Sequence, residues 1–404
     1  MKYVVIVGDG MADRPIKELG GKTPLQVAKT PFMDMLASKA SVGMVRTIPV
    51  GFHPGSDIAN LSILGYDPSV CYTGRAPLEA ASIGIDLGDN DVAYRCNLVT
   101  LKFCKGMTNA IMDDYSAGHI TSEEARGLIA SIQERLGSEE FSFHPGVSYR
   151  HLMVWKDGCP DVECIPPHDI TGKLISDYLP IGRCCEKIQG IMRASVEILK
   201  EHEINRRRAE KGLKPANSIW LWGQGKKPSL TPFFEKYHLN GALISAVDLT
   251  KGLGIYAGLK VINVPGATGW LDTNYEGKAQ YGLDALNDCD FLYLHIEAPD
   301  EAGHSGRIDY KIQAIEDLDR RIIKPVYEGL RERYDTFRLL ILPDHPTPIE
   351  IKTHSDEPVP FILYDSKKTI SKNRTYSEQI SSEEDCIFVE KGNTLMDLFI
   401  RHQL

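Results

Sequence analysis

Short apolar runs alternate with helix-like stretches at the start of this chain. Residues 4–7 form a continuous apolar run, which is typical of a strand buried on both faces of a parallel sheet. Residues 23–40 carry helix formers interrupted by Pro31, and residues 41–48 have the pattern of a strand that ends in a Gly/Pro-rich turn. A further helix is predicted to begin at Ser56.

The C-terminal part repeats this alternation. Strand-like runs lie at residues 218–222, 242–247, 260–264, 290–296 and 338–342. Helical stretches follow at residues 230–237, 277–287 and 311–330. Strands and helices that alternate at this length predict an α/β fold with a mostly parallel sheet flanked by helices.

The middle of the chain has a different pattern, with hairpin-like strands at 92–103 and 148–154, acidic helices and a basic helix at 193–211. We therefore expect two domains. The expected division is a discontinuous core of residues 1–85 and 216–404, and an inserted, smaller α+β domain of residues 86–215.

Composition narrows the function classes. The net charge of −9 disfavours a nucleic-acid or anionic-membrane surface but not a small anionic substrate. No apolar run approaches the roughly 18 residues of a membrane span, and the N-terminus enters a strand rather than a signal peptide. The nine cysteines form no Cys-x-x-Cys pair, so we expect free thiols in a reducing cytoplasm.

Carboxylates and imidazoles follow the predicted C-terminal strands. Asp300 and His304 come after one strand, Asp344 and His345 after the next, and His354 lies shortly beyond. Open α/β sheets build their sites at such strand ends, and these side chains are suitable ligands for Mn²⁺ or Zn²⁺. Any one pair is more often a turn carboxylate beside a hydrogen-bonded histidine, but the whole set predicts a metal site.

Two N-terminal residues extend this prediction. Asp9 follows the first strand and either holds the turn there or joins the cluster, if both ends of the chain share one sheet. Ser56, with Asp57 in the predicted first helical turn, is either an N-cap or a nucleophile. The chain has no Gly-x-Ser-x-Gly elbow and no conventional triad order. A nucleophilic Ser56 would therefore need activation by a divalent cation.

The order of these residues resembles the two-metal constellation of the alkaline phosphatase superfamily. Longer phrases are similar to one branch, the archaeal-type 2,3-bisphosphoglycerate-independent phosphoglycerate mutases. These phrases are VGDGMADRP (7–15), HPGSDIANLSILGYDP (53–68), YTGRAPLEA (72–80), PGATG (265–269), LDTNYEGK (271–278), EAPDEAGH (297–304) and PDHPTP (343–348). The resemblance spans nearly the whole chain and is weakest in the inserted domain.

The resemblance implies an alkaline-phosphatase-like core with two divalent cations, an inserted substrate-binding cap and no 2,3-bisphosphoglycerate cofactor. The expected ions are Mn²⁺, with Zn²⁺, Co²⁺ or Mg²⁺ as alternatives. The implied ligands are Asp9, Ser56, Asp344 and His345 for one cation, and Asp300, His304 and His354 for the other.

The implied reaction is an isomerisation. Ser56 would take the phosphoryl group from 3-phosphoglycerate, and the 2-hydroxyl of the retained glycerate would take it back. A cytoplasmic enzyme of glycolysis and gluconeogenesis is expected, with oligomeric state left open. The alternatives are a phosphatase, a phosphonate or phosphoester hydrolase with the same core, and a non-catalytic metal-binding protein.

Retention of glycerate requires cations outside the metal pair. By resemblance, the substrate-binding candidates are Arg150, His151, His168, Lys226 and Lys227. Each of them could equally be a surface cation or a satisfied histidine.

One phrase of the insert departs from the family pattern. Where an Asp-Arg-Arg-Ala-Gly-Arg type phrase is expected, this chain has Tyr115, Ser116 and His119 in place of the arginines. Cationic substrate contacts at these positions are therefore in doubt.

Overall fold

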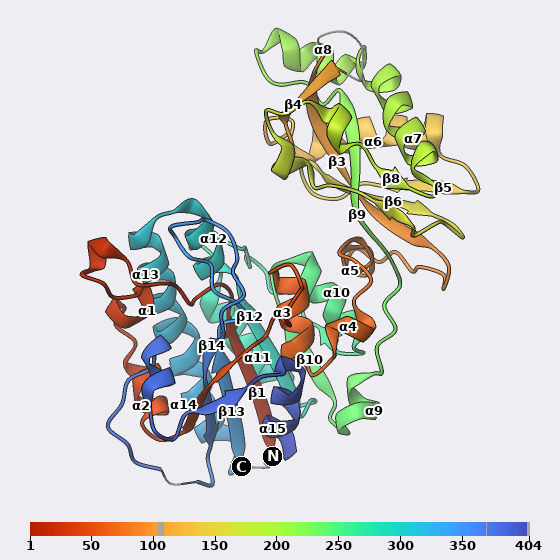
Figure 1. The fold of residues 1–404 in the computed structure, drawn as a ribbon. Coiled ribbons are helices and arrows are strands. Elements are labelled where there is room, and N and C mark those ends of the chain that lie inside the picture. The colour runs from red at the N-terminus through yellow and green to blue at the C-terminus, as the bar shows by residue number, and fades with distance from the viewer. Residues whose placement is uncertain (104–108, 369, 402–404) are drawn as a thin grey trace. The chain divides into compact units, whose positions relative to one another are not determined.

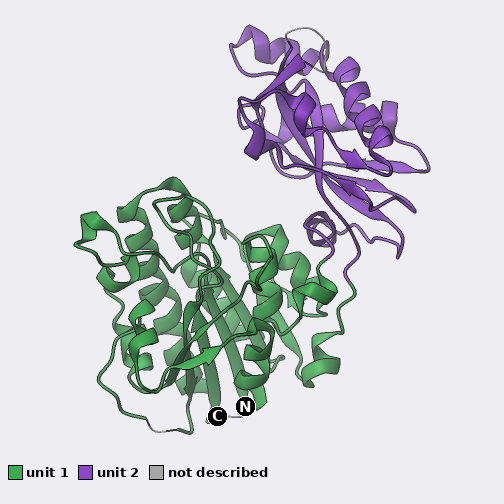
Figure 2. Ribbon diagram, viewed as in Figure 1, with its two compact units in different colours: residues 1–72, 229–404 green, residues 73–228 purple. Residues whose placement is uncertain are grey.

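The computed structural model describes residues 1–103, 109–368 and 370–401. The chain divides into two compact units, coloured separately in Figure 2. Unit 1 is discontinuous and comprises residues 1–72 and 229–404, whereas unit 2 is the continuous segment 73–228.

The segments around the expected domain boundaries belong to unit 2. Helix α5 (Ala76–Ser82) and strand β9 (Ser218–Lys226) both pack on strand β3 (Val92–Phe103). Unit 2 therefore begins before residue 86 and ends after residue 215.

Unit 1 is built on an eight-stranded sheet of order β11-β10-β12-β1-β13-β14-β2-β15 (Figure 1). Every neighbouring pair is parallel except the two pairs that involve β14. The mostly parallel α/β sheet predicted from the sequence is confirmed. The strands are β1 (Lys2–Gly8), β2 (Ser41–Val45), β10 (Gly241–Ile244), β11 (Lys260–Val261), β12 (Phe291–Ile296), β13 (Phe337–Leu342), β14 (Val359–Asp365) and β15 (Ile387–Val389).

The central strands are buried on both faces because helices cover both sides of the sheet. Val4, Val5, Ile6 and Val7 are all fully buried, as expected of a continuous apolar run. The unit 1 helices are α1 (Pro24–Val27), α2 (Pro31–Ala37), α3 (Ser56–Ile63), α4 (Pro68–Cys71), α9 (Phe233–Tyr237), α10 (Asp248–Tyr256), α11 (Tyr275–Ala285), α12 (Ala298–Ser305), α13 (Ile308–Leu318), α14 (Lys324–Arg333) and α15 (Leu395–Arg401).

Pro31 interrupts the helical stretch over 23–40, as expected, and begins α2, a position that suits its fixed φ and missing N–H. Two predicted helices are divided in the structure. The basic helix expected over 193–211 is split between α7 (Cys185–Leu199) and α8 (Glu203–Glu210). The stretch expected as one helix over 311–330 is α13 and α14 joined by a π-helical turn at Asp319–Ile323.

Unit 2 contains a five-stranded antiparallel sheet in which β3 pairs with β4, β6 and β9. The other strands of this sheet are β4 (Ala110–Asp114), β5 (Phe141–His144) and β6 (Arg150–Trp155), whereas β7 (Val162–Glu163) and β8 (Ile181–Gly182) form a separate two-stranded sheet. The α-helices after α5 are α6 (Ser122–Leu136), α7 (Cys185–Leu199) and α8 (Glu203–Glu210). Unit 2 is thus an α+β insert, as predicted.

The strand expected at 218–222 was assigned to the wrong sheet. It is the start of β9, which runs antiparallel to β3 in unit 2 rather than joining the parallel sheet of unit 1. The apolar pattern identifies a strand but not its partner, because pairing depends on segments more than a hundred residues away.

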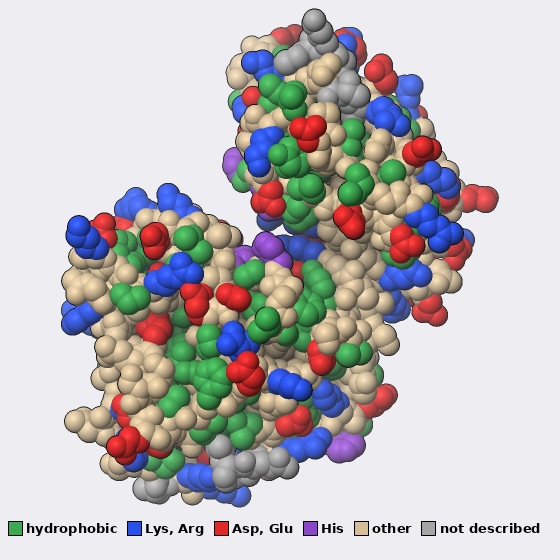
Figure 3. All heavy atoms as spheres, in the orientation of Figure 1, with side chains coloured by type: hydrophobic (Ala, Val, Ile, Leu, Met, Phe, Trp, Pro, Cys, Tyr) green, Lys and Arg blue, Asp and Glu red, His purple; other side chains and the backbone are tan. Residues whose placement is uncertain are grey.

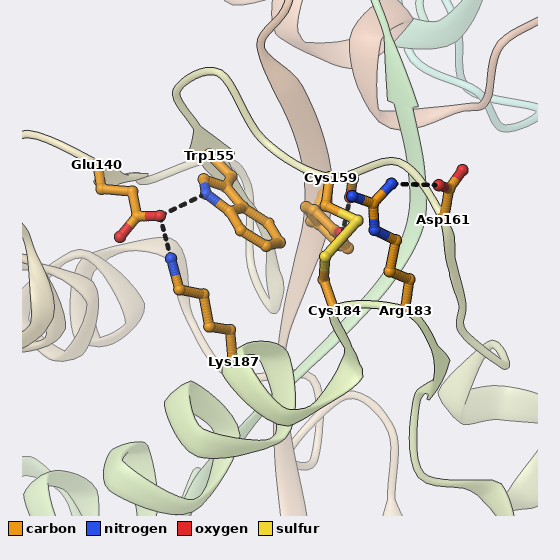
Figure 4. The surroundings of a disulfide bond; sticks show 8 residues. Glu140, Trp155, Cys159, Asp161, Arg183, Cys184 and Lys187 are labelled. Carbon is orange, nitrogen blue, oxygen red and sulfur yellow. Dashed lines mark hydrogen bonds and ion pairs between the residues drawn. A yellow bond between two sulfur atoms is a disulfide. The ribbon is translucent and has the colours of Figure 1, made fainter.

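The expectation that all cysteines are free thiols is wrong for one pair. Cys159 and Cys184 form a disulfide (Figure 4). Pairing of β7 with β8 places Val162 opposite Gly182 and so brings the two cysteines together, which their spacing alone does not reveal. Cys104 lies outside the described residues.

Charged side chains of both signs are interspersed over the face of each unit seen in Figure 3. Within the described ranges, no helix has the length and hydropathy needed to cross a membrane.

Candidate metal centre

Three segments bring carboxylates to one edge of the unit 1 sheet. β1 lies between β12 and β13 in parallel register. Asp9 directly follows β1, Asp344 lies just beyond β13, and Asp300 is in the first turn of α12, which follows β12. The two ends of the chain therefore share one sheet, which is the condition under which Asp9 joins the cluster.

Ser56 is the first residue of α3, as predicted, with Asp57 in the same turn. Gly55 occupies the N-cap position, and the Ser56 hydroxyl does not cap the helix. Its Oγ lies 3.0 Å from His345 Nε2, and the same nitrogen is 3.5 Å from Asp9 Oδ1. The candidate nucleophile is thus in contact with the carboxylate and imidazole cluster.

Asp300, His304 and His354 form a second group. His304 Nε2 is 3.1 Å from Asp300 Oδ2, and His354 Nε2 is 3.5 Å from Asp300 Oδ1. The two Nε2 atoms are 3.0 Å apart. His304 Nδ1 donates to the Lys352 carbonyl at 2.9 Å, so its Nε2 is the atom left for a cation.

The electrostatics of Asp9 fit a cation. Its Oδ1 is buried without a hydrogen-bond partner. Burial and the negative charges of Asp344 and Asp300 raise its pKa well above the usual value. Three carboxylates buried this closely need positive charge among them, and the Asp/His donor set suits a divalent metal ion.

The other two carboxylates are stabilised as anions. Burial raises the pKa of Asp300, but hydrogen bonds from His304 and His354 outweigh it and lower the pKa well below the usual value. In the opposite direction, the carboxylate of Asp300 raises the pKa of His304 to about 9 against the effect of burial.

Asp344 is held by several donors. Its Oδ1 accepts from the backbone N–H groups of Gly10 and His345 at 3.0 and 2.9 Å. Its Oδ2 accepts from Asn60 Nδ2 at 2.8 Å. Asn60 is a positioning residue that sequence reasoning missed, although it lies one helical turn after Ser56 on the same face of α3.

A buried network behind this edge was also missed. Glu297 accepts from Lys278 Nζ at 2.5 Å, from Ser245 Oγ at 2.7 Å and from the Ala246 amide at 2.6 Å. His295 Nδ1 lies 3.4 Å from Glu297 Oε1. Burial lowers the pKa of His295, but Asp344 and Glu297 outweigh it and raise the pKa to about 9. In the sequence, the only sign of this network is that a polar residue, His295 or Glu297, lies on each side of the apolar Ile296.

Lys311 joins the segments that carry the cluster. Its ammonium group is fully buried in α13 and donates to Asp13 Oδ2 at 2.8 Å, to the Ala12 carbonyl at 3.0 Å and to the Thr347 carbonyl at 2.8 Å. The Thr347 hydroxyl in turn donates to Asp300 Oδ1. One ammonium therefore binds both the loop after β1 and the loop after β13.

Four of the predicted substrate-binding residues lie at the surface of unit 2. Arg150 is exposed at the start of β6, with its guanidinium over the Tyr149 ring. His168 is also exposed. Lys226 Nζ is 3.4 Å from Asn90 Oδ1, and Lys227 Nζ is 3.2 Å from Asp86 Oδ1.

His151 differs from these four because it is only 2% exposed. Its Nδ1 accepts from the Gly146 amide at 3.0 Å, and burial lowers its pKa to about 3. It is therefore a neutral imidazole inside unit 2.

A guanidinium cluster in unit 2 was missed by the sequence reasoning. Arg95 is 6% exposed, its Nε is 2.9 Å from Glu79 Oε2, and its guanidinium stacks 4.3 Å from the Trp222 ring. Arg75 Nε is 3.2 Å from Glu79 Oε1. Burial lowers the pKa of Arg95 to about 10. Arg75 lies in the phrase YTGRAPLEA (72–80), which resembles the family and could have drawn attention to it. Arg95 is a single charged residue within the mostly apolar strand β3, and the sequence gives no sign of its partners.

The segment that departs from the family pattern forms a tight left-handed turn. Ala117, Gly118 and His119 have φ values of 50°, 65° and 50°, a conformation that is costly for residues other than glycine. The rings of Tyr115 and His119 lie 5.7 and 6.1 Å from that of Tyr149. Aromatic contacts thus occupy the place where arginines were expected.

Known proteins of one enzyme family are similar to this chain in sequence. The sequence profile of the 2,3-bisphosphoglycerate-independent phosphoglycerate mutase family matches residues 37–205. The chain is 54% identical over 400 residues to the enzyme of that name from Methanothrix thermoacetophila, and 52% identical over 402 residues to that from Methanosarcina barkeri. Both alignments cover 99% of this chain and 100% of the relative.

Solved structures are similar across the whole chain. A Pyrococcus horikoshii protein aligns with a TM-score of 0.80 at 29% identity, covering 99% of this chain and 96% of that one. The cofactor-independent phosphoglycerate mutase from Thermoplasma acidophilum aligns with a TM-score of 0.65 at 26% identity, covering 100% of both chains.

Proposed function

The chain belongs to the 2,3-bisphosphoglycerate-independent phosphoglycerate mutases and is an isomerase, and from this premise we propose that it interconverts 3- and 2-phosphoglycerate through a phosphoserine at Ser56. The observation that carries the assignment of Ser56 is its 3.0 Å contact with His345 within the buried Asp/His cluster.

We assign two divalent cations to this cluster, with Mn²⁺ as the expected ion. Asp9, Ser56, Asp344 and His345 would hold one, and Asp300, His304 and His354 the other. When bound, such ions favour the serine alkoxide and offset the charge of a transferring phosphoryl group. The unpartnered Asp9 Oδ1 and the two facing imidazole nitrogens support this assignment.

The protein's own groups orient the reacting hydroxyl. Ser56 begins α3, where the N-terminal end of the helix dipole favours an anion. Asn60 Nδ2 donates both to the Ser56 carbonyl and to Asp344 Oδ2, each at 2.8 Å. Asn60 therefore fixes Ser56 relative to the ligand carboxylate of Asp344. Transfer of a phosphoryl group to the serine hydroxyl requires such a fixed orientation.

We assign retention of glycerate to unit 2, with Arg150, His168, Lys226 and Lys227 as the candidate groups. Arg150 is the strongest of these, because its guanidinium is exposed and suits bidentate binding of a carboxylate. His151 is left out of this assignment because it is buried. We place the enzyme in cytoplasmic glycolysis and gluconeogenesis.

The test is incubation of the purified protein with 3-phosphoglycerate that carries ³²P in its phosphoryl group, in the presence of Mn²⁺. We expect 2-phosphoglycerate as the main product and a ³²P-labelled protein on rapid quenching. Ser56→Ala should lose both turnover and label while retaining bound Mn²⁺. Free phosphate as the main product would instead indicate a hydrolase, and an unchanged rate in Ser56→Ala would refute the nucleophile assignment.

A further inference from the structure

His295 lies within β12 with its ring fully buried at the carboxylate edge. Its Nδ1 faces Glu297 Oε1 at 3.4 Å. Its Nε2 faces two carboxylates, 3.5 Å from Asp9 Oδ2 and 3.8 Å from Asp344 Oδ2, and has no hydrogen-bond partner. None of the ligand sets described above includes this histidine.

The surroundings of Glu297 determine which ring nitrogen carries the hydrogen. Glu297 is held as an anion by the buried ammonium of Lys278 and accepts from Ser245 and the Ala246 amide. A carboxylate in this position accepts the Nδ1 hydrogen of His295. The Nε2 atom then faces two carboxylate oxygens, an arrangement that requires positive charge between them. A proton on Nε2 supplies this charge in the metal-free protein, and a bound divalent cation would take the place of that proton.

Asp9 presents its two oxygens to two different histidines. Oδ1 faces His345 Nε2 at 3.5 Å, whereas Oδ2 faces His295 Nε2 at 3.5 Å. One carboxylate oxygen from each of Asp9 and Asp344 and a nitrogen of His295 lie within 4.8 Å of one another. A histidine that gives one nitrogen to this group and the other to a fixed carboxylate matches the usual carboxylate–histidine–metal arrangement.

We propose that His295 Nε2 is a further ligand of the divalent cation held by Asp9 and Asp344, and that Glu297 and Lys278 fix its orientation. This inference rests on the proposed metal-dependent function. His295 Nε2 would be a fifth donor beside Asp9, Ser56, Asp344 and His345. Mn²⁺ commonly takes six ligands, so a fifth donor is compatible with this ion.

Two substitutions separate the roles of the two nitrogens. In His295→Asn the amide can take the place of Nδ1 and keep the bond to Glu297, but no atom remains at the Nε2 position. In His295→Gln the terminal amide reaches the Nε2 position and offers an oxygen to the ion. His144→Asn, at a half-buried histidine of β5 in unit 2, is the matched control.

The readouts are Mn²⁺ affinity by titration calorimetry and the nitrogen couplings of bound Mn²⁺ by electron spin-echo spectroscopy, with ¹⁴N- and ¹⁵N-histidine. We expect His295→Asn to weaken one Mn²⁺ site by at least about tenfold and to remove one nitrogen coupling. His295→Gln should weaken it less, and His144→Asn should leave both readouts unchanged.

Wild-type affinity and unchanged nitrogen couplings in His295→Asn would overturn the inference while leaving the proposed function intact. Equal losses in the Asn and Gln variants with unchanged nitrogen couplings would also overturn it, because His295 would then serve folding alone. Failure of the wild-type protein to bind Mn²⁺ would instead refute the proposed metal-dependent function.

Discussion

Replacement of Lys311 by methionine tests whether one buried ammonium holds the metal-binding edge together. The three bonds of Lys311 reach Asp13, Ala12 and Thr347. Methionine fills a similar volume but donates nothing, so the Asp13 carboxylate loses its buried cationic partner and two buried carbonyls lose a donor. The loops that carry Asp9 and His345 then lose their common attachment to α13.

The expected loss of stability in Lys311→Met follows from these contacts. Removing one partner of a buried ion pair costs about 3–5 kcal/mol, a large part of the 5–15 kcal/mol that stabilises a typical domain. In a unit of this size each kcal/mol corresponds to roughly 2–4 °C in Tm. We therefore expect the first unfolding transition of Lys311→Met to fall by about 10 °C, and its Mn²⁺ affinity to fall as well.

The assay is differential scanning calorimetry with chelator and with Mn²⁺, together with a Mn²⁺ titration below the lowered Tm. The matched control is Arg338→Met, because Arg338 is a buried cation bonded to Asp365 and to the Phe399 and Ile400 carbonyls. The control should lose Tm but keep its Mn²⁺ affinity. A wild-type Tm in Lys311→Met, or an equal loss of Mn²⁺ affinity in both variants, would refute the reasoning.

Three further predictions concern the metal centre and the disulfide. Asp300→Asn should remove most mutase activity and weaken Mn²⁺ binding measured by calorimetry, because the amide cannot supply the charge of the carboxylate; full activity in this variant would contradict the assignment. The raised pKa of His304, about 9 against a usual 6.5, stabilises the metal-free fold fully below pH 6.5, and this contribution is lost as the pH rises through 9. The same proton must leave before a metal binds, so Mn²⁺ affinity should rise between these values with proton release in calorimetry; a flat profile would count against His304 as a ligand. Reduction of the Cys159–Cys184 disulfide, which closes a loop of sequence separation 25, should destabilise unit 2 by roughly 3 kcal/mol in urea unfolding, whereas a Cys159→Ser/Cys184→Ser double variant should not respond to reductant.

Much of the fold and of the metal cluster could be predicted because the signals are local. A continuous apolar run such as residues 4–7 indicates a buried strand, and polar residues placed directly after such runs meet at one sheet edge. Asp9 and Asp344 follow this rule, and the structure brings them together as expected.

What could not be predicted depends on contacts between distant segments. β9 has the pattern of any apolar strand, and its antiparallel partner β3 cannot be read from that pattern. His295 and Lys311 lie inside an apolar strand and an amphipathic helix, where a single polar residue gives no sign of its partners. Their roles appear only when the loops after β1 and β13 are placed beside them.

The position of β1 in the middle of the unit 1 sheet has a consequence for synthesis on the ribosome. β1 is translated first, but its neighbours β12 and β13 begin at Phe291 and Phe337. At about 5–20 residues per second, the nascent apolar segment waits on the order of 15–60 s for its first partner. Unit 2 is continuous and is fully translated during that interval. Nascent chains of this protein should therefore depend on chaperones that shield the N-terminal segment, and should do so most strongly when elongation is slow.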